Sequence, residues 1–296
     1  MMSKLNILNI PEFIDFNEKI NIALKGKNKE LERCYIPIGD VVTIAGYRTL
    51  EAPALFTTSE EGTIDTIEFE GKERVVLTGL KQRAVIRRVH SGLIRGILGD
   101  NYRCVVPDNL CGRCVNCFQF GSMNSDTNVQ VKSRTNITSS FSLQGSDEAI
   151  SEDEEFHIMV HSDLSMKKGE DTDTQARASI YTNEVVKPGV IFPFLVYIYN
   201  PAQFDIVSYV KAHLIADLRG YGSYSTIRSQ ASSEFVLITK DLSLSPSVML
   251  NKGKEEILNM VKREVTLFGD KEIKSLADEF GALASKYKDQ LYGWRA

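Results

Sequence analysis

Four cysteines fall close together in the stretch "YRCVVPDNLCGRCVNCFQFGSM", which begins at residue 102. The chain has five cysteines in all, and these four are spaced as C-x6-C-x2-C-x2-C. Closely spaced thiolates suit a tetrahedral site for a soft metal, and zinc binds four of them with bonds of about 2.3 Å. Four protein ligands leave no position for water, so the sequence predicts a structural Zn²⁺ that staples a loop. The predicted ligands are Cys104, Cys111, Cys114 and Cys117.

Other interpretations of the cysteine cluster stay open. Steps of C-x2-C also ligate iron–sulfur clusters, although the further cysteine beside a proline that usually follows is absent from the sequence. The thiols could instead carry no metal and do redox chemistry, whereas disulfides are rare in proteins that are not secreted. His90 could replace one cysteine, because three ligands in two-residue steps are crowded around one ion. The fifth cysteine, Cys34, is expected to be a small packed side chain.

Charge is distributed unevenly along the chain. The formal net charge is −4, but residues 147–173 alone hold ten acids and two lysines, which leaves +4 for the remainder. Residues 72–134 hold eleven Lys or Arg and four acids. Such segregation can give a protein that is acidic overall a basic face suited to phosphates, although both stretches could also be ordinary solvated surface.

The elements that must position these residues alternate between extended and helical patterns. Runs rich in β-branched residues indicate strands, and apolar residues at helical spacing indicate two amphipathic helices. Their order is typical of a βαββαβ ferredoxin-like sheet, an α+β fold that hosts RNA binding among many other functions. In chain order the elements are strand 39–48, helix 80–98, extended segment 127–143, strand 190–199, helix 201–218 and strand 233–242.

The sequence gives no sign of a membrane or export segment. The longest apolar run, 190–199, has ten residues, which are too few to cross a bilayer. The first residues lack the apolar core and cleavage site of a signal peptide. We therefore expect a cytoplasmic protein with no membrane partner.

Three segments together resemble the repeated backbone subunit of type I-D CRISPR effector complexes, a member of the RAMP superfamily. They are the cysteine stretch with its following "FQFGS", "TNEVVKPGVIFPFLVYIYNP" at 182–201, and "RGYGSYSTIRSQ" at 219–230. The resemblance covers roughly residues 39–242. It implies a single domain over 1–296, with a modified RNA-recognition (RAMP) palm, a thumb hairpin and a small zinc-binding insertion.

The same resemblance implies where these parts lie and what they bind. The palm would comprise 39–100 and 189–242, the zinc knuckle 101–123, the thumb-like insertion 145–188, and a C-terminal helical segment 243–296. Implied partners are CRISPR RNA (crRNA), target DNA or RNA, copies of the same chain in a helical filament, and other subunits of the complex.

Capture of an RNA backbone regardless of sequence needs cations for phosphates, open amides and aromatic rings for bases. In "RGYGSYSTIRSQ" two glycines could let backbone N–H groups approach an anion, and two tyrosines could stack on bases. Without the resemblance, the same loop could be a helix-to-strand turn with surface tyrosines. The residues expected to bind RNA are Arg48, Lys132, Arg134, Arg177, Arg219, Gly220, Tyr221, Gly222, Tyr224 and Arg228.

No enzymatic activity is expected, but two alternatives remain. Related backbone subunits of type III complexes cut target RNA with an acidic residue in a loop after the first strand. The matching stretch here, "TTSEEGTID", offers Glu60, Glu61 and Asp65 as candidates for a metal-dependent nuclease. The other alternative is a generic zinc-stabilised nucleic-acid-binding protein.

Overall fold

The computed structural model describes residues 5–14, 23–25, 31–35, 39–57, 63–124, 129–157, 179–222, 228–261 and 269–292. Its central elements are β3 (Val41–Leu50), α3 (Gly79–Leu98), β8 (Thr135–Ile137), β12 (Ile191–Tyr199), α6 (Gln203–Arg219) and β13 (Ala231–Thr239). The four strands form an antiparallel sheet in the order β13-β3-β12-β8, with α3 following β3 and α6 following β12. This βαββαβ arrangement agrees with the ferredoxin-like order that the sequence predicts.

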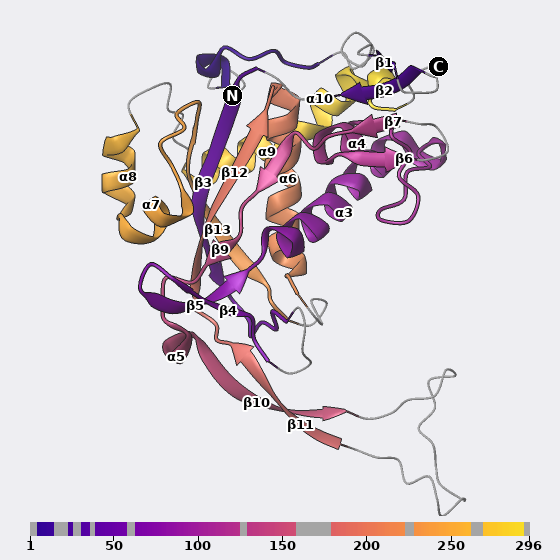
Figure 1. Ribbon diagram of the computed structural model, residues 1–296. Coiled ribbons are helices and arrows are strands. Elements are labelled where there is room, and N and C mark those ends of the chain that lie inside the picture. The colour runs from indigo at the N-terminus through magenta and orange to yellow at the C-terminus, as the bar shows by residue number, and fades with distance from the viewer. Residues whose placement is uncertain are drawn as a thin grey trace, which may run out of the picture.

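One face of this sheet is covered by α3 and α6, which pack against each other (Figure 1). Phe192, Phe194 and Val196 of β12 lie in the main core, whereas Leu195 joins a second apolar cluster. The strand is therefore buried on both faces, which is why its sequence is a continuous apolar run without polar alternation.

The second apolar cluster lies where α7 and α8 cover the opposite face of the sheet (Figure 1). Ala45 and Leu195 of the sheet pack there against Met249 and Ile257 of the two helices. Pro246 starts α7, where a missing N–H costs nothing, and the Ser245 hydroxyl caps the helix by accepting from Val248 N. The helix bounds are Pro246–Asn251 for α7 and Lys254–Met260 for α8.

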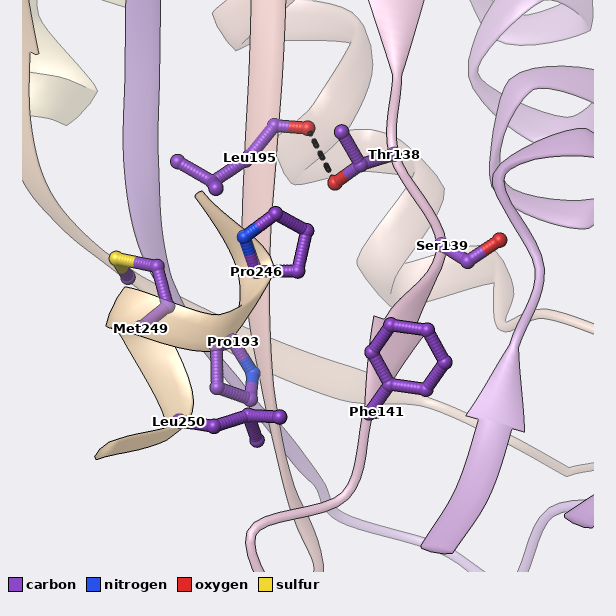
Figure 2. A pocket seen from close by; sticks show the side chains of 8 residues that line it. All are labelled: Thr138, Ser139, Phe141, Pro193, Leu195, Pro246, Met249 and Leu250. Carbon is purple, nitrogen blue, oxygen red and sulfur yellow. Dashed lines mark hydrogen bonds between the residues drawn. The ribbon is translucent and has the colours of Figure 1, made fainter. Parts of the chain in front are cut away.

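A small cavity lies between β12 and α7 (Figure 2). The backbone N–H and the hydroxyl of Thr138 both donate to the Leu195 carbonyl, each at 3.1 Å. Pro193, two residues earlier on β12, has no N–H with which to extend this ladder. The cavity that it lines measures about 10 Å³, which holds about one water molecule at most. It is a packing defect beside a proline and is too small for a ligand.

A two-stranded ribbon, β10 and β11, projects from one end of the sheet (Figure 1). Its base is fixed to the segment that follows β3, because Ala54 and Val186 exchange backbone hydrogen bonds of 2.9 and 2.8 Å. The Glu184 carboxylate also accepts the Ile64 N–H at 3.0 Å. The ribbon lies within 145–188, the segment predicted to be an insertion. The bounds are α5 (Ser146–Ala149), β10 (Ile150–His157) and β11 (Ser179–Val186).

Smaller elements complete the described chain. One further sheet has the order β1-β2-β7-β6, and another has the order β4-β5-β9. No helix among the described residues is long and apolar enough to cross a membrane. The elements are η1 (Asn6–Leu8), β1 (Ala23–Lys25), β2 (Leu31–Tyr35), β4 (Thr66–Phe69), β5 (Lys72–Leu77), η2 (Gly99–Asn101), α4 (Val115–Phe120), β6 (Ser122–Asn124), β7 (Val129–Val131), β9 (Ser140–Phe141), α9 (Asp270–Asp278), α10 (Phe280–Lys286) and η3 (Lys288–Gln290).

Gly46, in the middle of β3, allows the two neighbouring strands to pack closely. A Cβ atom at this position would lie 2.2 Å from the Glu234 carbonyl oxygen and 2.5 Å from the Phe194 ring. We expect Gly46→Ala to lower the free energy of unfolding by about 1–3 kcal/mol, as overpacked cores do, in a denaturant titration. Gly96→Ala is the control, because a Cβ on this α3 residue would meet nothing within 4 Å. It should stabilise the protein by about 0.5–1 kcal/mol, and equal effects of both substitutions would contradict this packing.

Candidate metal centre and nucleic-acid interface

The four clustered cysteines surround one point. Their Sγ atoms all lie within 4.8 Å of one another. Cys117 Sγ is 3.5 Å from that of Cys104 and 3.9 Å from that of Cys111. Four thiolates bonded at about 2.3 Å to one ion in tetrahedral geometry have their sulfurs about 3.8 Å apart. A disulfide would need about 2.0 Å, so the spacing fits a shared metal ion and not a cross-link.

Local backbone geometry holds the sulfurs in place. Cys114 is the N-cap of α4, and its Sγ accepts the Cys117 N–H at 3.4 Å. Cys111 Sγ accepts the Arg113 N–H at 3.3 Å. The C-terminal segment closes over the site, because the Leu291 carbonyl accepts the N–H of Val115 at 3.1 Å. Backbone pairing therefore ties the cysteine segment to the C-terminal segment.

Burial disfavours the thiolate form at one position of the cluster. Burial raises the pKa of the Cys114 thiol, so a thiolate there needs a positive charge beside it. His90 lies outside the cluster, with Nδ1 3.0 Å from the Asn116 amide nitrogen. Burial, with the nearby Arg87, lowers the pKa of His90 to about 3, so its ring is neutral. The four cysteines thus come together without His90.

The glycine-rich loop starts where α6 ends, and its glycines serve packing. The Gly220 N–H donates to the Ala216 carbonyl at 2.9 Å, so it has no hydrogen left for a phosphate. A Cβ on Gly220 would lie 2.4 Å from the Arg228 carbonyl, and one on Gly222 would lie 2.4 Å from the Leu55 carbonyl. Both residues have positive φ, +80° and +82°. The prediction that Gly220 offers an open amide to RNA is therefore wrong.

Arg48 is fully buried beneath α3 and α6. Its Nε donates to the Asp217 carboxylate and its Nη1 to Gln82 Oε1, each at 3.0 Å. Nη2 lies 3.0 Å from Nε2 of His213, a buried ring whose pKa burial lowers to about 3. The guanidinium stacks 4.4 Å from the centre of the Tyr221 ring. Arg48 and Tyr221 are both 0% exposed, so the prediction that they contact RNA is wrong.

Arg134 makes the corresponding buried pair at the other end of α6. Its Nη1 and Nη2 donate to the two carboxylate oxygens of Asp205 at 2.7 and 2.5 Å. Its Nη1 also donates to the Asn200 carbonyl at 2.9 Å, and its Nε to the Phe118 carbonyl at 3.3 Å. With 0% exposure, Arg134 cannot reach RNA, and that prediction is wrong as well. Arg134 joins α4 of the cysteine segment to α6.

The remaining predicted cations do not form one local cluster. Lys132 and Arg219 are exposed, and Arg228 is half-buried. Lys132 is two residues from Arg134, which pairs near the start of α6, whereas Arg219 is the last residue of that helix. A helix of 17 residues is about 25 Å long. A ligand that contacted both Lys132 and Arg219 would therefore have to extend along the surface, because the two residues do not line one pocket.

Several candidates lie outside the described residues, namely Arg177, Tyr224, Glu60 and Glu61. Asp65 is described, and its carboxylate pairs with Lys81 Nζ at 2.8 Å. This pair gives Asp65 an ordinary electrostatic role.

The buried partners of the arginines were not predicted from the sequence. Tyr209, His213, Asp217 and Tyr221 recur every four residues, so they line one stripe of α6 and the turn that follows it. This spacing was a usable signal, because polar residues on the apolar stripe of a buried helix need partners inside the core. Nothing local marks Gln82 as the third partner of Arg48.

Comparisons with known proteins agree with this architecture. A family model described as "Csc2 Crispr" matches residues 28–278. The chain is similar in fold to the crystal structure of Thermofilum pendens Csc2, with a TM-score of 0.54 and 17% identity over 88% of this chain and 92% of that one. Weaker likenesses are to a CRISPR RNA-guided surveillance complex (TM-score 0.43, 15% identity, 84% of each chain) and to the type III-B Cmr-beta complex bound to cognate target RNA (0.45, 17%, 66% of this chain and 61% of that one). No curated protein matches the sequence.

The buried pair of Arg134 and Asp205 should contribute strongly to stability. Asp205→Ala would leave a buried guanidinium without its counter-charge, and we expect the free energy of unfolding to fall by about 3–5 kcal/mol in a denaturant titration. Asp278→Ala is the control, because this 77%-exposed carboxylate pairs with Lys211, also on α6. Its removal should change the free energy by less than about 1 kcal/mol. Similar losses from both substitutions would contradict a special role for the buried pair.

Proposed function

Because the chain belongs to the Csc2 CRISPR family, we propose that it is a non-catalytic backbone subunit of a cytoplasmic type I-D CRISPR interference complex. In this function several copies line up along crRNA, bind it regardless of sequence, and present it to target DNA or RNA beside other subunits. The family match over residues 28–278 is the observation that carries the proposal. The ferredoxin-like palm and its projecting ribbon supply a body and an arm suited to such repeated contacts.

The cations that remain accessible are the proposed phosphate contacts. Arg219 lies exposed at the end of α6, Lys132 lies exposed near its start, and Arg228 follows the glycine-rich loop. Since the first two are separated by about the length of α6, they suit an extended strand better than a compact ligand. Gly222, Arg177 and Tyr224 keep their predicted RNA contacts as part of this proposal.

The proposed cofactor is one structural Zn²⁺ held by Cys104, Cys111, Cys114 and Cys117. Four thiolates with no free position suit zinc as a fold element, and the cation would stabilise the buried thiolates. We assign the chain no catalytic step, because the described acidic candidate, Asp65, is paired with Lys81.

Binding of RNA through phosphates should depend on salt and not on sequence. Full-length protein should bind unrelated single-stranded oligoribonucleotides with similar affinity, and log K should fall with log salt at a slope of about −0.7 per phosphate contact. We expect Arg219→Ala to weaken binding and reduce this slope by about one contact's share, as measured by fluorescence anisotropy.

Lys211→Ala is the matched control, since this cation lies on the same helix but pairs with Asp278. It should leave the slope unchanged. Affinity that ignores salt, or a strong preference for one short sequence, would contradict the proposed function.

The metal can be tested separately from RNA. Purified protein should contain about one zinc per chain by elemental analysis, and Cys111→Ser should reduce both zinc content and thermal stability. Because the Leu291 carbonyl bonds to the backbone beside Cys114, loss of metal should also expose the C-terminal segment to protease. Cys34→Ser should keep the metal, and full zinc content in Cys111→Ser would rule out this ligand set.

A further inference from the structure

In the part of the chain that the structure describes, the sheet face opposite α3 and α6 carries an open groove. α7 and α8 cover the part around Ala45 and Leu195, and a groove of about 480 Å³ opens next to them. Its floor is formed by β3 and β12, and its wall by the turn between α7 and α8. Pockets of about 300–1,000 Å³ are the usual size for small ligands, so this groove is large enough for one. The polar and aromatic residues that line it are Tyr47, Thr49, Glu234, Asn251, Lys252 and Lys254.

Tyr47 of β3 lines this groove. It pairs across the sheet with Pro193 on one side and Glu234 on the other. The ring is half-buried against the second apolar cluster, and its hydroxyl donates to the Lys252 carbonyl at 3.5 Å. The second apolar cluster thus packs against the Tyr47 ring, which also borders the groove. A fixed aromatic on a central strand is suited to stacking a planar ring.

The rim of the groove carries polar groups of both kinds. Lys254 forms an ion pair with Glu234, and both side chains are about half exposed. Asn251 is exposed, and Thr49 is half-buried on β3. Donors and acceptors thus lie side by side on this rim, as they do on the edge of a nucleobase. Lys252 and Lys254 give the rim two positive charges, balanced by Glu234 and by Glu70, whose carboxylate bonds to Asn251.

We propose that this groove holds one nucleotide of a single-stranded nucleic acid, with the base stacked on Tyr47, its edge towards Glu234 and Asn251, and its phosphate near Lys254. The inference rests on the proposed function, because it adds a base-binding position to a subunit that otherwise contacts phosphates. Stacking accepts any base, so such a site does not conflict with binding that ignores sequence.

The test uses full-length protein and single-stranded oligoribonucleotides that carry 4-thiouridine. Irradiation followed by mass spectrometry should place a cross-link on the β3 peptide that contains Tyr47. Tyr47→Ala should weaken binding about 5- to 100-fold, whereas Tyr47→Phe, which keeps the ring, should stay within about two-fold of the wild type. The cross-link needs no substitution, so it decides the matter even where Tyr47→Ala fails to fold.

Tyr199→Ala is the matched control. Tyr199 is an exposed tyrosine on β12 that shares the face of Tyr47 but lies six residues along the strand from Pro193, about 20 Å away. Its substitution should leave affinity unchanged. Equal losses for Tyr47→Ala and Tyr199→Ala would overturn the inference.

Other outcomes separate this inference from the proposed function. Wild-type protein that binds RNA with the expected salt dependence, but shows no cross-link in β3 and no loss in Tyr47→Ala, would overturn the groove alone. A Tyr47→Ala variant that binds RNA normally but fails to associate with copies of itself would assign the groove to a protein segment instead, and would also overturn it. Wild-type protein that binds no RNA at all would contradict both the nucleotide site in the groove and the proposed function.

Discussion

Two buried arginines, each paired with an aspartate of α6, hold that helix on the sheet at both ends. Arg134 binds Asp205 near the first turn of α6, and Arg48 binds Asp217 near its last turn. A charge taken out of water is costly unless it is paired and hydrogen-bonded, and here Gln82 and His213 add polar contacts to the ion pair of Arg48. An α6 shifted by one residue would break both pairs at once. The ionic pairs therefore fix the register of the helix more sharply than its apolar contacts could.

The position of α6 in turn determines two other parts of the molecule. Arg134 also donates to the Phe118 carbonyl in α4, so the cysteine segment is attached to the same buried ion pair that holds the start of α6. At the other end Tyr221 donates to the Asp217 carboxylate at 2.7 Å and stacks on Arg48, which fixes the start of the glycine-rich loop. One helix thus relates the cysteine cluster to the loop.

The parts of this structure that follow from local pattern were predictable, and those that depend on distant partners were not. The apolar run of β12, the amphipathic α3 and the spacing of the four cysteines each identified an element from neighbouring residues alone. The burial of Arg48 was hidden because arginine is usually exposed and its partner Asp217 is 169 residues away. The prediction for Gly220 failed for a related reason. In a sequence, a glycine that is required for close packing cannot be told from one that lets a phosphate approach the backbone. In each case the residue type indicated an unusual position, but the contacts that explain it come from residues distant in the sequence.

The charge of the ribbon limits how it could work in the proposed assembly. Strands β10 and β11 contain five acids and no lysine or arginine, and Glu152 pairs directly opposite Glu184. Like charges facing each other destabilise a two-stranded sheet, and the same carboxylates repel phosphates. The described ribbon is therefore unsuited to grip an RNA backbone by charge, in contrast to the excess of basic residues in the part of the chain that holds α3 and the cysteine segment. In the proposed assembly, an arm of this composition would leave attraction for the nucleic acid to the body from which it projects.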